Sequence, residues 1–280
     1  MKILHVVPGL DVIGNGIAVA AKLLAGDQNA DIIDTHKFIE GDMVLASYDE
    51  VWVHSCWLPM TLKACWRVLR AERPLVRMIH ANLDPVRLHY HGWKKWLVGL
   101  FDRFLLRRCT KIVATCVAEK SWIQSYLGEH CPPVEVTDIK RFFKLTKSEV
   151  GTLLNEHPLH LLYLGRQHPL KGLACLEEAV KGIEGVELRV VSNAFGEEKE
   201  RVWEWCDALV LPTLSENFGL VIAEALERGK RVITTDGAPA WGDGNDYGGR
   251  LVYLKGYRDG TDEDRIQLLN KAIKSFCEGH

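Results

Sequence analysis

Four charged side chains in the second half of the chain have the types and spacing to bind an anionic sugar compound. Arg166 and Lys171 flank one turn, and Glu216 and Glu224 bracket a second stretch that follows the apolar run at 208–212. An arginine fork combined with a mobile lysine charge suits a diphosphate. A turn between a strand and a helix also points backbone N–H groups and the positive end of the helix dipole at an anion. These positions predict a phosphate-binding site with carboxylates for sugar hydroxyls.

A simpler interpretation of the same residues is a pair of ordinary strand–turn–helix units. Glu216 would then complement the start of a helix, and the other three charges would lie in solvent. Two anion-seeking turns in the same half of the chain favour the binding site.

A third glycine-containing turn follows the first apolar run. Gly14 and Gly16 allow a backbone to approach a ligand closely, and Asp34 lies near the distance expected of a dinucleotide-binding acid. Val19 occupies the place of the third glycine of that fingerprint. Dinucleotide binding, a plain turn and a loop facing an interdomain cleft therefore all remain open, with the last preferred.

His80 stands after a predicted strand, where a histidine can donate to a sugar hydroxyl or handle a proton. His54 follows the preceding strand and is a weaker candidate of the same kind. A structural role is the alternative for both.

The segment 87–108 interleaves Trp, Tyr, Lys and Arg with Leu and Phe at helical spacing. This composition suits a helix at a membrane surface, and it equally suits an amphipathic helix packed on a sheet with a basic outer face. The acidic triplet 262–264 resembles a short metal-binding pattern, but acids at the start of a helix are typical caps. We therefore predict no metal site.

These residues need strands to position them, and the chain alternates short apolar runs with segments of helical period. The clearest predicted strands are 3–7, 50–54, 75–79, 111–115, 159–164, 186–191, 208–211 and 231–234. This alternation predicts an α/β fold of parallel sheets covered by helices, in two halves with a cleft between them. The break in rhythm at 132–158 places the boundary near 150. We expect one domain at 1–150, which the final helix at 263–276 could complete, and a second domain at 151–280.

Composition limits the classes of function. The 280 residues carry 35 Lys+Arg against 37 Asp+Glu, so nothing global indicates nucleic acid as a partner. The eight cysteines include no Cys-x-x-Cys pair and indicate reduced thiols of an intracellular protein. No apolar run is long enough to span a membrane or to form a signal peptide. We expect a cytoplasmic protein, with attachment to the inner face of the membrane left open.

With these motifs in this order, the second half resembles the retaining glycosyltransferases of family 4 (glycosyl transferases group 1). The match is specific at 165–172 and at 211–224, and looser at 14–16 and around His80, where the family usually has His-Gly. The resemblance implies a GT-B architecture of two Rossmann-like domains that face each other across a cleft. The domain at 1–150 would then be the N-terminal acceptor domain, and the domain at 151–280 would be the donor domain that holds the nucleotide sugar.

The resemblance also implies residue roles. Arg166 and Lys171 would neutralise the diphosphate. The donor sugar and α-phosphate would be held by Glu216 together with the backbone of Asn217, Phe218, Gly219 and Leu220. Glu224 would bind ribose, and His80 would contact the transferred sugar. Gly14 and Gly16 would lie at the ligand, and no metal or other cofactor is needed.

One departure from the family pattern concerns the pocket for the nucleotide base. Only 16 residues separate Val190 from Asp207, where relatives fit a further strand and helix that carry part of the base pocket. A UDP- or GDP-sugar is the expected donor.

We predict a retaining hexosyltransferase that uses a nucleotide sugar and a glycan or lipid-linked acceptor in surface polysaccharide or lipopolysaccharide synthesis. The alternatives are an NAD-dependent oxidoreductase of a sugar-nucleotide pathway and a non-catalytic sugar-nucleotide-binding partner.

Overall fold

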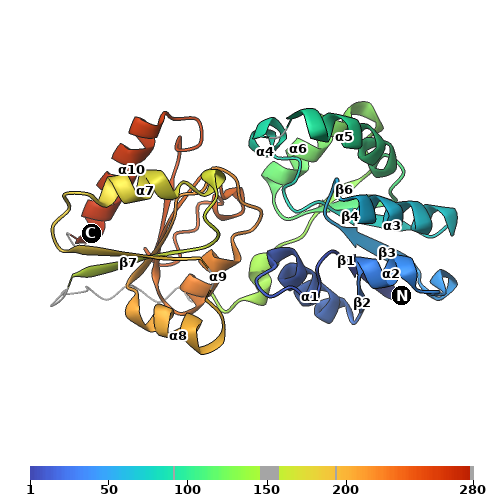
Figure 1. Ribbon diagram of the computed structural model, residues 1–280, viewed down its shortest axis with the longest axis horizontal. Coiled ribbons are helices and arrows are strands. Elements are labelled where there is room, and N and C mark those ends of the chain that lie inside the picture. The colour runs from blue at the N-terminus through green and yellow to red at the C-terminus, as the bar shows by residue number, and fades with distance from the viewer. Residues whose placement is uncertain (91, 146–157, 193, 278–280) are drawn as a thin grey trace. The chain divides into compact units, whose positions relative to one another are not determined.

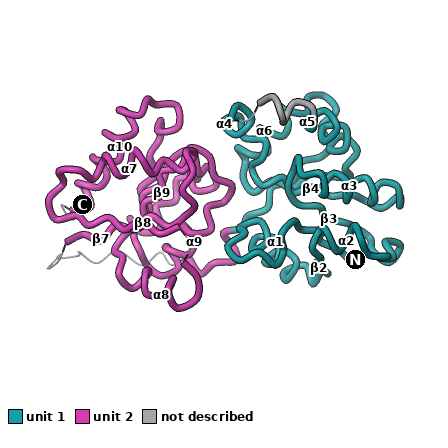
Figure 2. The backbone as a smooth tube through the Cα atoms, viewed as in Figure 1, with its two compact units in different colours: residues 1–139 teal, residues 140–280 magenta. Residues whose placement is uncertain are grey.

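The chain forms two compact units, each built on one parallel sheet. The computed structural model describes residues 1–90, 92–145, 158–192 and 194–277. Unit 1 comprises Met1–Ile139 and unit 2 comprises Lys140–His280 (Figures 1 and 2). The division thus falls earlier in the sequence than the predicted boundary near 150. Position 150 itself lies outside the described residues.

The sheet of unit 1 has the strand order β2-β1-β3-β4-β5-β6, with every neighbouring pair parallel. Its strands are β1 (Ile3–Val7), β2 (Asp31–Asp34), β3 (Glu50–His54), β4 (Leu75–Met78), β5 (Lys111–Ala114) and β6 (Val134–Val136). The central strands β1, β3 and β4 are buried almost throughout, as expected of a sheet covered on both faces. Their carboxyl ends carry the loops that contain the glycine turn and His80.

Helices cover both faces of this sheet. They are α1 (Gly16–Gln28), α2 (Thr35–Glu40), α3 (Pro59–Arg70), α4 (Pro85–Tyr90), α5 (Gly92–Leu106) and α6 (Val117–Leu127), with short turns η1 (Leu45–Ser47), η2 (Gly128–His130) and η3 (Ile139–Phe142). Side chains of α2, α3, α5 and α6 form the larger core, whereas α1 packs Ala18 and Ala21 against Val7 on the other face. The helix predicted from about 86 to 108 is therefore two helices.

Unit 2 has a five-stranded parallel sheet in the order β11-β10-β9-β7-β8. Its strands are β7 (Leu159–Leu164), β8 (Val186–Val191), β9 (Ala208–Leu211), β10 (Arg231–Thr235) and β11 (Leu251–Leu254). Its helices are α7 (Leu173–Val180), α8 (Gly196–Trp205), α9 (Leu220–Glu227) and α10 (Asp262–Cys277), with turns η4 (Pro169–Lys171) and η5 (Pro239–Trp241). In Figure 1, α7 and α10 lie on one face of this sheet and α8 and α9 on the other.

These observations confirm the predicted α/β class with two parallel sheets. The final helix α10 lies in unit 2, where Leu269, Ile273 and Phe276 join the core with α7, rather than in unit 1. Strand β8 ends the sheet in the described part of the chain, and a single helix, α8, links it to β9. All eight cysteines are free, and five of them are buried. No helix among the described residues is long and apolar enough to cross a membrane.

Candidate active site

Three loops at the carboxyl ends of β7, β9 and β10 are tied together by backbone contacts. Leu170 O accepts hydrogen bonds from Leu214 N at 2.8 Å and from Thr213 Oγ1 at 3.1 Å. Gly172 has a φ of +67°, and a Cβ there would lie 2.0 Å from Pro212 O. A Cβ on Gly237 would lie 1.9 Å from Thr213 O. Both glycines are needed because the loops pass closer together than a side chain allows.

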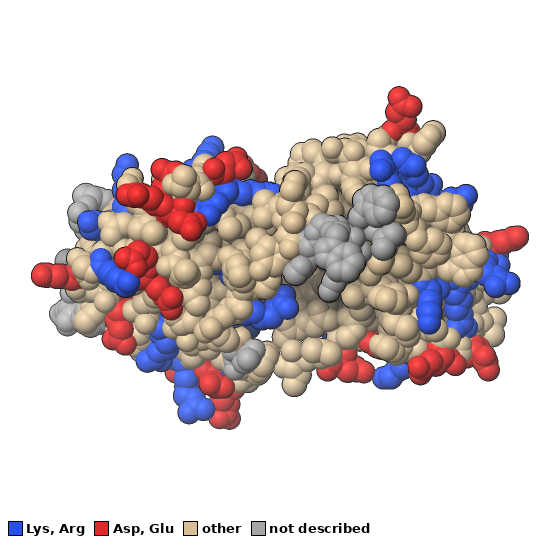
Figure 3. All heavy atoms as spheres, turned by 45° about the horizontal axis from the view of Figure 1, so that its top comes forward, with Lys and Arg blue, Asp and Glu red and all other residues tan. Residues whose placement is uncertain are grey.

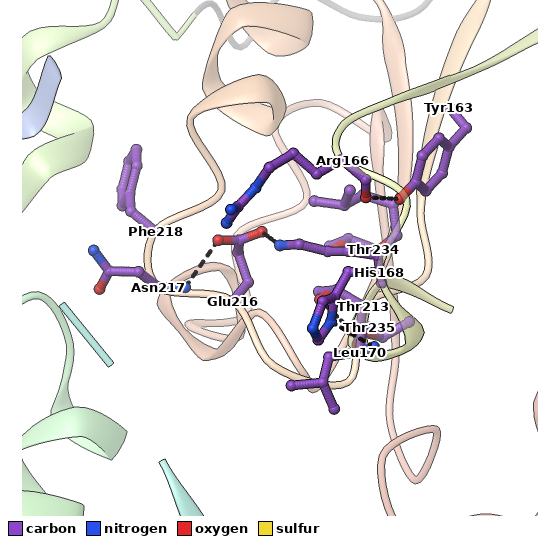
Figure 4. A network of polar contacts seen from close by, with 12 residues as sticks. Tyr163, Arg166, His168, Leu170, Thr213, Glu216, Asn217, Phe218, Thr234 and Thr235 are labelled. Carbon is purple, nitrogen blue, oxygen red and sulfur yellow. Dashed lines mark hydrogen bonds and ion pairs between the residues drawn. The ribbon is translucent and has the colours of Figure 1, made fainter. Parts of the chain in front are cut away.

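The Lys171 ammonium and the Glu216 carboxylate form an ion pair at the centre of these loops. Their side chains are only 14% and 18% exposed. The other Glu216 oxygen, Oε1, accepts from Asn217 N at 3.0 Å, and Glu216 N donates to Gly237 O at 2.7 Å (Figure 4). The two residues that the sequence singled out in separate turns therefore meet, and each neutralises the other.

Arg166 lies beside this pair. Its side chain is exposed, and Figure 4 shows it extending toward the Glu216 carboxylate. Its backbone is braced by Tyr163, whose hydroxyl donates to Arg166 O at 2.9 Å. Burial, together with the nearby Glu216 charge, raises the pKa of Tyr163 to about 12, so the phenol stays protonated as a donor. The site thus offers two cations around one carboxylate.

The start of α9 faces the same loops. Gly219 precedes the helix with a φ of +72°, and Leu220 is the first helical residue. The loop before it is held by Trp241, whose Nε1 donates to Phe218 O at 2.5 Å and whose ring lies 5.2 Å from that of Phe218. Asn217 is half-buried at the turn itself. The first N–H groups of α9 and its dipole therefore come to a fixed position, which favours an anion.

Glu224 lies further along α9 and has a partner that the sequence analysis missed. Lys199 Nζ of α8 lies 2.6 Å from Glu224 Oε2, and both side chains are about one quarter exposed. Among the described residues, no hydrogen bond of standard geometry reaches this oxygen, and its contact with Lys199 is an ion pair. A lysine one turn into a helix gives no local signal, because only the tertiary packing of α8 on α9 brings it to the carboxylate.

The glycine turn of unit 1 is organised by two side chains. Gly14 has a φ of +78° and Gly16 begins α1, while Asn15 between them caps the helix by accepting from Ile17 N. Asp34 accepts from Leu10 N at 3.0 Å and from His36 N at 2.8 Å. Each of its carboxylate oxygens accepts a backbone N–H group, one bracing the glycine turn and the other capping α2. Asp34 therefore has a local role in holding this loop.

His80 follows β4 in strained backbone. His80 and Ala81 have φ values of +58° and +53°, and Ala81 N donates to Glu119 Oε1 at 2.5 Å. Because Glu119 also accepts from Thr115 N and Oγ1, it ties the loops after β4 and β5 together. The His80 ring is buried and lies 2.9 Å, nitrogen to nitrogen, from His54. His54, predicted as its rival, is its neighbour.

The acidic triplet at 262–264 begins α10 and caps it. Asp264 Oδ2 accepts from Thr261 N and Oγ1, and Asp262 pairs with Arg265. Within the described part of the chain, no group of three or more His, Cys, Asp or Glu side chains is placed to hold a metal ion. Of the residues predicted in unit 2, Lys171 and Glu216 form a direct pair, whereas Glu224 pairs with Lys199. Gly14, Gly16 and His80 lie in unit 1.

The fold of this chain is similar to that of several solved structures. HepE of Anabaena, in complex with UDP and glucose, has a TM-score of 0.65 at 15% identity, covering 100% of this chain and 91% of that one. Sucrose-phosphate synthase of Thermosynechococcus elongatus has 0.70 at 13%, covering 98% and 90%. The lipopolysaccharide outer core galactosyltransferase WaaB has 0.61 at 14%, covering 100% and 92%. The fold is therefore GT-B.

Residues 140–257 match the family model described as Glycosyl transferases group 1. The range contains the Lys171–Glu216 pair and the start of α9. The second half of the chain is therefore similar to a glycosyl transferases group 1 domain. No curated protein matches the sequence.

Proposed function

We propose that the protein transfers a sugar, with retention at the anomeric carbon, from a nucleoside-diphosphate sugar to a hydroxyl of a glycan or lipid-linked acceptor. The observation that carries this proposal is the Lys171–Glu216 pair beside Arg166 at the start of α9. Two cations and a helix N-terminus suit the diphosphate, and a half-buried carboxylate suits sugar hydroxyls. Positive charge at the bond that breaks also stabilises the departing nucleoside diphosphate.

Donor binding in unit 2 follows from the same loops. Arg166 and Lys171 would hold the diphosphate, and the N–H groups of the turn at 217–220 would hold the α-phosphate. Glu224, steered by Lys199, would accept from ribose hydroxyls at the next turn of α9. The relative HepE was solved with UDP-glucose as well as with UDP and glucose, and a UDP-sugar is the first donor to test here.

Retention is supported by how the buried carboxylates of unit 1 are used. Asp34, Asp84, Asp102 and Glu119 are its buried acids. Asp102 pairs with buried Arg77 at 2.9 Å, Asp84 accepts from Val86 N, and Asp34 and Glu119 accept backbone N–H groups as described. Because all four carboxylates are engaged in contacts that hold the fold, we propose that none of them acts as a general base or nucleophile. The leaving phosphate would then accept the proton of the acceptor hydroxyl as the new bond forms.

The first experiment is a thermal-shift panel of UDP-, GDP- and ADP-sugars, NAD and free nucleoside diphosphates. A ligand at one hundred times its dissociation constant adds about 2.7 kcal/mol to the free energy of unfolding. A shift with NAD alone would overturn the proposal, and so would the absence of any transfer or hydrolysis with a donor that binds. For a donor that is consumed, NMR of the product reads the anomer, and an inverted product would exclude retention.

Alanine variants assign the site. Lys171→Ala and Glu216→Ala should each abolish turnover while leaving the protein folded, because their side chains lie in loops rather than in the core. Lys181→Ala is the matched control, since that lysine forms an exposed ion pair with Glu178 in the same unit. Full activity in either site variant would remove that residue from the proposed role.

A membrane-linked acceptor is supported by an aromatic patch on α3 and α5. The patch consists of Trp66, Leu100, Phe101 and Phe104, which are 39–56% exposed. Phe101 lies 6.3 Å from Trp66 and 6.1 Å from Phe104 between ring centroids, and the Arg108 guanidinium lies 3.5 Å from the Phe104 centroid. His91 and the side chains of 92–97, which contributed to the original prediction, lie outside the described residues.

The surroundings of the aromatic patch are basic, because Lys63, Arg70 and Arg108 are exposed on the same helices or next to them. Figure 3 shows acidic and basic side chains intermixed on the face in view. Exposed aromatics with flanking cations suit the headgroup region of an anionic bilayer. We propose attachment at the inner face of the cell membrane and a role in surface polysaccharide or lipopolysaccharide synthesis, tested by sedimentation with vesicles.

A further inference from the structure

Three buried histidines and a glutamine form one line of hydrogen bonds across the sheet of unit 1. Gln28 Oε1 lies 2.7 Å from His5 Nε2, His5 Nδ1 lies 2.9 Å from His54 Nε2, and His54 Nδ1 lies 2.9 Å from His80 Nε2. Successive ring centroids are 5.1 and 5.2 Å apart. The histidines come from β1, the end of β3 and the loop after β4, which are neighbours in the sheet. We call this line the histidine chain.

The histidine chain has only two possible proton orders. A neutral imidazole carries one N–H, so each ring donates through one nitrogen and accepts through the other. Gln28 presents its oxygen to His5, which makes His5 Nε2 the donor and His5 Nδ1 an acceptor. His54 must then donate through Nε2, and His80 must do the same. The orientation of one amide at the end of α1 therefore determines the tautomer of His80, three residues away along the line.

The environment keeps the histidine chain neutral. The exposed fractions of His5, His54 and His80 are 0%, 0% and 2%. Burial lowers the pKa of His5 to about 4 and that of His80 to about 3, and it lowers the pKa of His54 well below the ordinary value. A proton added to His54 would turn an acceptor nitrogen into a second donor and break a hydrogen bond. Neutral rings that all donate in the same direction along the line satisfy each of these three hydrogen bonds.

Two simpler explanations fit less well. A metal site is disfavoured because the ring nitrogens face one another in pairs instead of converging, and the described residues include no metal-binding group. A purely structural network would not need to extend to the carboxyl ends of the strands, where the predicted ligand-binding residues lie. The histidine chain instead includes His80, and the backbone next to His80 is held separately by the Glu119 carboxylate, which accepts from Ala81 N.

We propose that Gln28 is a positioning residue for glycosyl transfer. Acting through His5 and His54, it fixes His80 as the Nε2–H tautomer, so that Nδ1 is the ring nitrogen that accepts a hydrogen bond from a donor-sugar hydroxyl. This inference rests on the proposed function for the contact between His80 and the sugar. The order of protons along the line depends on the fold alone.

The test reverses the order of protons along the histidine chain by changing the residue at position 28. In Gln28→Lys, an ammonium donates to His5 Nε2 and forces all three rings into the Nδ1–H form, whereas Gln28→Glu keeps an acceptor there. Selective ¹⁵N-histidine labelling reports the tautomers by NMR, with His5→Gln, His54→Gln and His80→Gln assigning the signals. Lys22→Gln exchanges the same two residue types at an exposed position of α1 and serves as the control.

We expect the Nε2–H form in the wild type and in Gln28→Glu, and the Nδ1–H form in Gln28→Lys. With a donor from the panel, kcat/KM should fall at least tenfold in Gln28→Lys and stay within threefold in Gln28→Glu and Lys22→Gln. Unchanged tautomers in Gln28→Lys would overturn the inference, and so would a reversed line with full activity. A wild type that binds and consumes no nucleotide sugar would instead refute the proposed function, and the inference with it.

Discussion

Acidification from pH 7 to pH 5 should destabilise unit 1 strongly, because its histidine chain cannot take up protons while folded. Burial lowers the pKa of His5 to about 4 and that of His80 to about 3, whereas both titrate near 6.5 in the unfolded chain. The unfolded state therefore binds more protons between these values, and stability falls as the pH falls through 6.5. The loss continues until the pH reaches the folded-state pKa values.

The size of the effect follows from the proton count. Each such histidine changes the free energy of unfolding by about 1.4 kcal/mol per pH unit, or about 2 kcal/mol between pH 6.5 and pH 5. His5 and His80 together contribute about 4 kcal/mol, and His54 adds to this in the same direction. Glu119 offsets part of it, because burial raises the pKa of its carboxyl and it binds a proton earlier when folded. A domain with about 5–15 kcal/mol of stability should feel this loss.

The assay is urea unfolding at pH 7, 6 and 5. Hydrogen–deuterium exchange of peptides from β1, β3 and β4 is the readout. Following these peptides separates unit 1 from unit 2, whose unfolding need not be coupled to it. His5→Gln should reduce the loss between pH 7 and pH 5 by about 2 kcal/mol, since it removes one titrating ring. His130→Gln, at an exposed position, is the control. The reasoning fails if wild-type stability is the same at pH 7 and pH 5, or if His5→Gln keeps the full dependence.

Three further predictions concern turns and surface. Gly172→Ala should cost about 1–3 kcal/mol more in urea unfolding than Gly182→Ala, because both have positive φ but only the first would place a Cβ 2.0 Å from a backbone oxygen; equal costs would contradict the contact. Ala81→Gly should stabilise the protein by about 0.5 kcal/mol by relieving left-handed strain, and a loss of stability would refute this. Phe101→Ser with Phe104→Ser should reduce sedimentation with anionic vesicles at least threefold, while neutral vesicles serve as the control; unchanged binding would exclude the aromatic patch.

The fold could be read from the sequence where apolar runs are long and bounded by glycine or proline. Strands such as Leu159–Leu164 and Val186–Val191 were predicted with the bounds that the structure shows. The short or partly exposed strands β2, β6 and β11 were missed, because three or four residues at a sheet edge carry too weak an alternation. The helix predicted over the 86–108 region ran through the break between α4 and α5, since amphipathic spacing continues across it.

The site was predictable to the extent that parallel sheets gather their loops at one end. Arg166, Lys171 and Glu216 follow β7 and β9, and neighbouring strands bring such loops together. The direct pairing of Lys171 with Glu216 could not be predicted, because it depends on the close passage that Gly172 and Gly237 allow. The histidine chain was equally hidden, since only the strand order makes His5 a neighbour of His54.

The Lys171–Glu216 pair should decide which ligands the proposed donor site favours. Both side chains are mostly buried, so separating them without new partners is costly. A nucleotide sugar supplies both partners, because its phosphate oxygens can accept from Lys171 while its sugar hydroxyls donate to Glu216. A free nucleoside diphosphate supplies only the first and leaves a carboxylate beside phosphate charge. We therefore expect the intact nucleotide sugar to give a larger thermal shift than the free nucleoside diphosphate at equal concentration. Equal shifts would mean that Glu216 does not contact the sugar.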